Sequence, residues 1–119
     1  MTESSRPSAL LGNTHKIDVP CGKGYLIVNK DAGGRVVELF FNIGKNGQCR
    51  RIMTDTAMKY ASILLQAGLR SLTDIASDLA DHECEHFNGS PDCARSCLDA
   101  IAMRLRMQAA TEVKDDATD

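Results

Sequence analysis

The sequence predicts a single small α+β domain, in which an antiparallel β-hairpin is followed by three helices packed on one face of the sheet. The length of 119 residues is typical of one domain. Two strand-like runs lie between residues 25 and 43, the second with alternating apolar residues, and after Gly47 apolar residues recur at helical spacing. The composition, with 43% hydrophobic and 25% charged residues, is that of a globular protein and excludes a largely disordered chain.

The hairpin is predicted from two runs of strand-forming residues. The first run is Tyr25–Asn29, which is short and apolar. The second covers 36–43, and one of its faces carries Val37, Leu39, Phe41 and Ile43. Residues 30–35 contain an Asp and two adjacent Gly, which favour a turn between the strands.

The first predicted helix begins after Gly47 and ends at Gly68. Its apolar face is expected to consist of Met53, Ala57, Tyr60, Ala61 and Leu64. Its polar face is expected to consist of Arg51, Asp55, Lys59, Ser62 and Gln66.

Two further helices each begin with a Ser that is followed three residues later by an Asp, the pattern of a capping box. Ser71 and Asp74 begin the second helix, and Ser96 and Asp99 begin the third. The core-facing residues are expected to be Leu72, Ile75, Ala76 and Leu79 in the second helix, and Leu98, Ile101, Ala102 and Leu105 in the third.

Both ends of the chain are polar. Residues 1–15 are predicted to be a flexible arm, because they show no sustained periodicity. Residues 111–119 contain four acids and are predicted to be a disordered acidic tail. The folded domain is therefore expected to cover 16–110.

Charge and hydropathy narrow the range of functions. The net charge of −2 provides no overall basic field for nucleic acid or anionic lipid. The chain shows neither a secretory signal nor a run of about 20 apolar residues, so we expect a cytoplasmic protein without membrane contact.

The five cysteines are the unusual feature of the composition. Thiols stay reduced in the cytoplasm, so an odd number of Cys there indicates metal ligands or catalytic thiols. Cys49 and Cys97 lie at predicted helix starts, where the helix dipole favours the thiolate that zinc binds. No CxxC pair occurs, and the spacing alone is also compatible with small buried hydrophobic residues.

Four segments of the chain resemble the TSCPD domain, a small module found at the C-terminal end of vitamin B12-dependent ribonucleotide reductases and as short stand-alone proteins. The resemblance covers about residues 17–106. The segments are Val19-Pro20-Cys21-Gly22, Gly44-Lys45-Asn46-Gly47-Gln48-Cys49, Ala67-Gly68-Leu69 and Ser96-Cys97-Leu98-Asp99-Ala100-Ile101-Ala102. In the last segment Leu98 replaces the family's Pro, and Arg95 replaces the preceding Thr.

The resemblance implies a structural zinc site that staples the domain, formed by Cys21, Cys49, Cys84 and Cys97. It also implies a non-enzymatic accessory or regulatory module with a protein partner, linked to ribonucleotide reductase or nucleotide metabolism. It implies no catalysis, because the reductase reaction resides in a large barrel for which 119 residues leave no room.

Other interpretations remain open. Lys23, Lys45, Arg50 and Arg51 could form a small anion or nucleic-acid site. Cys93 and Cys97 could form a thiol redox pair. Within the metal site, Cys93, His82 or His86 could replace one of the four Cys ligands.

Overall fold

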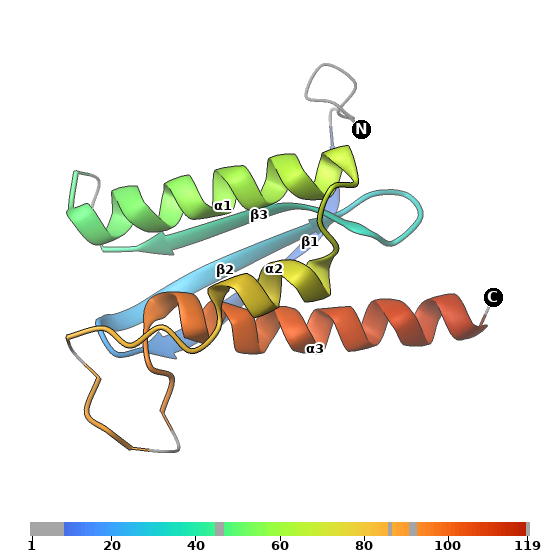
Figure 1. Ribbon diagram of the computed structural model, residues 1–119. Coiled ribbons are helices and arrows are strands. Elements are labelled where there is room, and N and C mark those ends of the chain that lie inside the picture. The colour runs from blue at the N-terminus through green and yellow to red at the C-terminus, as the bar shows by residue number, and fades with distance from the viewer. Residues whose placement is uncertain (1–8, 45–46, 86, 91–92, 119) are drawn as a thin grey trace.

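A computed structural model describes residues 9–44, 47–85, 87–90 and 93–118, and of 112–118 it describes the backbone only. Three strands are followed by three helices (Figure 1). The elements are β1 (Leu11–Val19), β2 (Gly22–Lys30), β3 (Val36–Ile43), α1 (Cys49–Ala67), α2 (Leu72–Leu79) and α3 (Cys97–Thr118). The predicted α+β class is confirmed.

The strands form one antiparallel sheet in the order β1-β2-β3. The predicted hairpin of β2 and β3 is confirmed, with Val28 paired to Leu39. Its turn is held by the Asp31 carboxylate, which accepts hydrogen bonds from the amides of Gly33 and Arg35 at 2.9 and 3.0 Å. This Asp side chain supplies the backbone partners that the turn would otherwise lack.

The sheet contains one strand more than the sequence predicts. β1 begins at Leu11, within the segment 1–15 that was expected to be a flexible arm. That expectation is wrong for 11–15, and residues 1–8 lie outside the described part of the chain. Only Ile17 and Val19 of β1 are buried, so most of the strand carries no apolar alternation and its pairing with β2 supplies its order.

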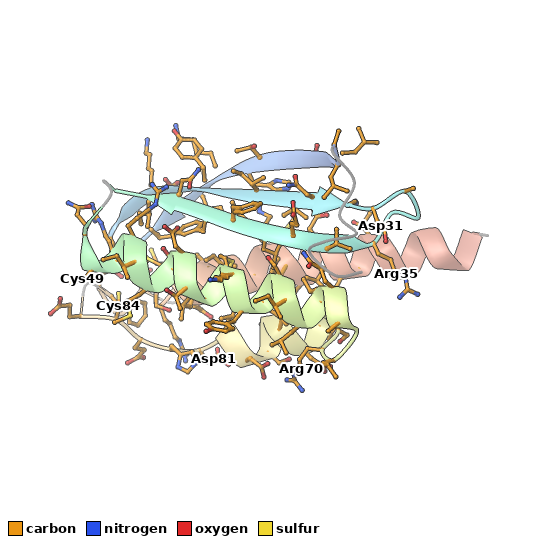
Figure 2. The ribbon with its side chains drawn as sticks, turned by 90° about the horizontal axis from the view of Figure 1, so that it is seen from above. Asp31, Arg35, Cys49, Arg70, Asp81 and Cys84 are labelled. Atoms are coloured by element: carbon orange, nitrogen blue, oxygen red, sulfur yellow. The ribbon has the colours of Figure 1, made fainter. Side chains whose placement is uncertain are left out.

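The helices pack on one face of the sheet and form a second layer. α1 lies along β3, α3 lies beside β1, and α2 packs against α3 (Figures 1 and 2). The largest fully buried side chains come from both layers and are Phe41, Leu26, Leu39, Met58, Ile101, Leu105 and Val28. The core therefore lies between the sheet and the helices. Burial of each such side chain contributes about 1.5–3 kcal/mol to the stability of the fold.

α1 buries only part of the predicted face: Ala61 is buried and Ala57 packs against the core, as expected. Met53 and Tyr60, which were expected in the core, are 71% and 60% exposed. Ser62, which was expected in solvent, is buried, and the Gln66 amide donates to the Val37 carbonyl at 3.0 Å. β3 is an edge strand whose outward N–H and C=O groups need partners, and polar side chains of α1 provide them.

The remaining helix ends largely follow the prediction. Gly68 ends α1 in the left-handed conformation, with a φ of 71°. The capping box of Ser71 and Asp74 is present at the start of α2. Ser96 caps α3, because its hydroxyl accepts a hydrogen bond from the Asp99 amide at 3.0 Å. The capping box predicts that the Asp99 carboxylate accepts from the Ser96 amide, but it accepts from the Arg95 and Asp81 amides.

α3 is longer than predicted. It continues to Thr118, whereas 111–119 was expected to be a disordered tail. No Gly or Pro interrupts this segment, so the helical backbone continues beyond its last core contacts. Among the described residues, no helix is both long enough and apolar enough to cross a membrane.

Candidate metal centre

The cysteines lie at the ends of secondary-structure elements, as the sequence indicates. Cys21 lies in the turn between β1 and β2, Cys84 follows α2, and Cys97 is the first residue of α3. Cys49 is the first residue of α1. Figure 2 shows Cys49 and Cys84 at the same end of the molecule. The fold therefore brings segments that are distant in sequence to one end of the domain.

The Cys97 thiol has two other thiols near it. Cys97 is buried, and the Cys21 and Cys84 thiols both act to raise its pKa. Cys21 and Cys84 are both half-buried. Three of the four cysteines that the family resemblance implies as ligands are thus neighbours in space.

Backbone contacts hold these thiols in place. The Cys84 amide donates to the Arg95 carbonyl at 2.9 Å, which ties the segment after α2 to the start of α3. The Arg50 guanidinium donates to the Cys21 carbonyl at 2.9 Å, which ties the β1–β2 turn to α1. The backbone segments that carry Cys21 and Cys84 are therefore held by bonds that do not involve the sulfur atoms.

The Asp99 carboxylate positions the segment that carries Cys84, although the capping-box pattern predicts that it binds the Ser96 amide. Asp99 is buried and accepts from the amides of Asp81 and Arg95 at 2.8 and 2.9 Å. These two residues bracket the segment that carries Cys84. Asp99 thus closes that segment at both ends, and the acid three residues after the Ser96 cap was the only sequence signal for it.

The electrostatics of Cys97 differ from the expected effect of a helix start. Burial, and then the neighbouring Cys21 and Cys84 thiols, raise the pKa of Cys97 to about 12, although the Arg50 charge opposes this. In the absence of a cation, Cys97 is a protonated thiol at neutral pH and not an activated nucleophile.

The cysteines do not stand as a preformed metal cage. Within the described residues, no group of three or more His, Cys, Asp or Glu side chains is arranged to hold a metal ion. Cys49 is exposed. The donor set has the chemistry of a zinc site, but its side chains would have to turn toward a common point.

The two arginines of the predicted anion site are engaged within the chain. Arg50 binds the Cys21 carbonyl, as described above. Arg51 forms a 3.2 Å salt bridge with Asp55 and donates to the Asn42 side chain at 3.0 Å. Lys23 is exposed on β2, and Lys45 lies outside the described residues. The two arginines therefore support the local fold.

The remaining candidates lie in or next to the segment between α2 and α3. The exposed His82 ring contacts the Asp78 carbonyl at 3.1 Å through Nε2, and His86 lies outside the described residues. Cys93 is exposed and lines a cavity. The thiol neighbours of Cys97 are Cys21 and Cys84, so the geometry favours neither His82 as a ligand nor a redox pair of Cys93 with Cys97.

Comparisons with known proteins identify the domain. The family model of the TSCPD domain matches residues 2–109 of the 119-residue chain. A search of curated proteins returns no match, and neither does a search of solved structures. The TSCPD domain is known from ribonucleotide reductases. Because the matched region spans nearly all of the sequence, the chain belongs to the TSCPD domain family.

Proposed function

We propose that this chain is a zinc-binding accessory module, with Cys21, Cys49, Cys84 and Cys97 as the metal ligands. The observation that carries the proposal is that the Cys21 and Cys84 thiols, from two other segments, lie near enough to Cys97 to raise its pKa. Structural metal sites in small domains are typically built from thiols that loops and helix starts contribute in this way.

The donor set supports zinc more than a calcium-type or magnesium-type ion, which would require oxygen ligands. When the thiols ionise, their negative charges repel one another in a half-buried setting, and a bound dication offsets that cost. The nearby Arg50 charge acts in the same direction. Cys49 belongs to the proposed set because α1 begins at the same end of the domain (Figure 2).

The proposed role of the metal is structural. Four protein ligands leave no coordination position for water or substrate, so a closed site of this kind stabilises a fold and carries out no reaction. A domain of this size has a small core, and a metal site that joins α1, α3 and the β1–β2 turn adds to its stability.

We propose further that the domain acts on a protein partner, a ribonucleotide reductase or another enzyme of nucleotide metabolism, and has no catalytic activity of its own. Family membership supports this proposal, because the TSCPD domain is known from such reductases. The raised pKa of Cys97 also disfavours a reactive thiol at the centre of the cluster.

The ligand assignment is tested by single substitutions in reduced protein. Cys21→Ser, Cys49→Ser, Cys84→Ser and Cys97→Ser should each lower zinc affinity strongly, as measured by competition with a chromogenic chelator. Cys93→Ser is the matched control, because Cys93 is an exposed thiol outside the proposed set. Equal zinc affinity in all five variants would refute the assignment.

The accessory role is tested with a vitamin B12-dependent ribonucleotide reductase from the same cell. The purified chain should bind the reductase or change its turnover, and by itself should reduce no ribonucleotide. Turnover by the isolated chain, in proportion to its concentration and through stringent purification, would contradict the non-enzymatic role. No binding and no change in reductase turnover would contradict the partner.

A further inference from the structure

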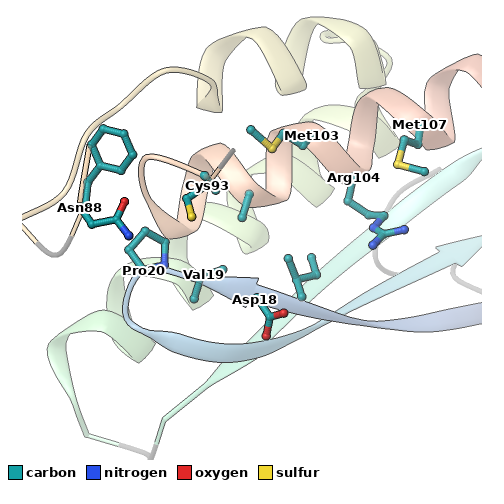
Figure 3. A pocket seen from close by; sticks show the side chains of 12 residues that line it. Asp18, Val19, Pro20, Asn88, Cys93, Met103, Arg104 and Met107 are labelled. Atoms are coloured by element: carbon teal, nitrogen blue, oxygen red, sulfur yellow. The ribbon is translucent and has the colours of Figure 1, made fainter. Parts of the chain in front are cut away.

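A second feature of the molecule lies beside the cysteine cluster and is independent of it. A cavity of about 570 Å³ opens between the end of β1, the segment before α3, and α3 itself (Figure 3). Cavities of about 300–1,000 Å³ are the usual size for sites that bind small molecules. This cavity is therefore large enough for a compact ligand.

The walls of the cavity are mainly apolar. β1 and the following turn contribute Ile17, Val19 and Pro20, and α3 contributes Ala100, Met103 and Met107. Met103 and Met107 are 47% and 58% exposed. Flexible methionine side chains suit a surface that adapts to an apolar ligand.

Among the described residues that line this cavity, Arg104 is the one basic residue, and none of the described acidic residues pairs with it. Its half-buried guanidinium makes no salt bridge and no hydrogen bond within the part of the chain that the structure describes. Asp18 is the acidic residue among the described lining residues; it lies opposite Lys23 in the β1–β2 register and forms no salt bridge with Arg104.

The positive charge of Arg104 also acts on a neighbouring residue of β1. Burial and then the positive charge of Arg104 lower the pKa of His15 on β1. An unpaired, partly desolvated guanidinium is a strong site for carboxylate or phosphate oxygens, which it can bind through two parallel hydrogen bonds.

We propose that this cavity binds a small amphiphile with an apolar body and one anionic group, a carboxylate or a phosphate monoester. The apolar body lies against the Val19, Pro20 and Met103 wall. The anionic group pairs with Arg104. This binding site goes beyond the zinc-binding role and does not depend on it.

The proposal is tested by isothermal titration of the reduced, zinc-equilibrated full chain with octanoate, octyl phosphate and octanol. These probes share one apolar chain and differ in the charge of the head group. At least one anion should bind about tenfold more tightly than octanol, since a charge-assisted hydrogen bond contributes that much or more. Comparison of the two anions identifies the preferred head group. Equal binding of all three probes, or binding of none, would overturn the proposal.

Paired variants locate the site. Arg104→Gln should remove the preference for the anion, whereas Arg106→Gln, an exposed position on α3 outside the cavity, should retain it. Ala94→Leu should fill the cavity and weaken binding of every probe, whereas Ala110→Leu on the exposed side of α3 should not. If both members of a pair behave alike, the ligand does not occupy this cavity.

A reporter in the unmodified protein keeps the test decisive if a variant fails to fold. The His15 imidazole lies within range of the Arg104 charge and contacts the Gln108 side chain at 3.3 Å. Its NMR signals should shift on addition of the preferred anion and should shift much less with octanol. No shift at saturating anion would overturn the assignment to Arg104.

Discussion

Substitution of Ser62 by Ala tests how α1 is joined to the sheet. The Ser62 hydroxyl accepts from the Leu39 amide at 2.9 Å, and it lies 3.2 Å from the Leu39 carbonyl oxygen and 2.8 Å from the Met58 carbonyl oxygen. All of these groups are buried. Ala would leave the outward N–H of β3 at Leu39 without a partner.

The expected loss of stability follows from these bonds. A buried donor without a partner costs about 1–3 kcal/mol, while replacing Ser by Ala within a helix returns about 0.5 kcal/mol. The net loss is therefore about 0.5–2.5 kcal/mol. With an unfolding entropy of about 2.1 cal/mol/K per residue, the 119-residue chain should melt about 2–10 °C lower.

The control is Ser77→Ala, because Ser77 is an exposed residue inside α2 and gains the same helix propensity. Urea unfolding and thermal melting of both variants, followed by circular dichroism, give the comparison. If Ser62→Ala melts at the same temperature as Ser77→Ala, the Leu39 amide finds another partner, and the contact between α1 and the β3 edge does not stabilise the fold as argued.

Three further predictions concern the packing around the candidate site. Gly24→Ala should destabilise the domain by about 1–3 kcal/mol in urea unfolding, because a Cβ there would overlap the Phe41 ring; stability equal to that of the wild type would show that the ring moves aside at no cost. Ser96→Ala should remove the α3 cap, destabilise the domain by about 1 kcal/mol and so lower its melting temperature; an unchanged melting curve would contradict that cap. Burial works to raise the pKa of Asp99, but hydrogen bonds from two backbone amides outweigh it and hold the pKa below its ordinary value. The ionised Asp99 carboxylate thus adds to the free energy of unfolding above pH 3.8, and this contribution is lost as the pH falls below it. Asp99→Asn should therefore be less stable than the wild type at pH 7, and its stability should fall less steeply in acid. Parallel curves of stability against pH for the two proteins would refute this linkage.

The hairpin and the second and third helices could be predicted because their signals are local. The predicted core positions Val37, Leu39, Phe41 and Ile43 are all buried, although Val36 and Glu38 on the other face are buried as well. The Ser71 capping box and the Gly68 helix end also depend only on neighbouring residues. Such patterns can be recognised in the sequence without knowledge of the tertiary fold.

The buried face of α1 could not be predicted in the same way. Apolar periodicity assigns a helix to the core through its hydrophobic residues, but α1 packs beside an edge strand that presents unpaired backbone groups. Polar residues such as Ser62 and Gln66 satisfy those groups, so they turn inward while Tyr60 faces solvent. The choice of face depends on the position of β3, which the α1 sequence does not contain.

The candidate site shows the same division between local and distant information. The positions of the cysteines at element ends were visible in the sequence, as was the Ser96 cap. The roles of Asp99 and Arg104 were not, because each depends on segments that are brought together from elsewhere in the chain. The raised pKa of Cys97 likewise arises from burial and from thiols on other segments.

The zinc content of the reduced protein tests the central proposal most directly. Protein expressed with sufficient zinc and purified without chelators is measured by elemental analysis, and its fold is checked by circular dichroism. Four thiolates around one metal predict about one zinc per chain, released together with a loss of thermal stability when the thiols are modified or protonated. A folded domain that carries no zinc, and whose melting temperature does not respond to added zinc, would contradict the account.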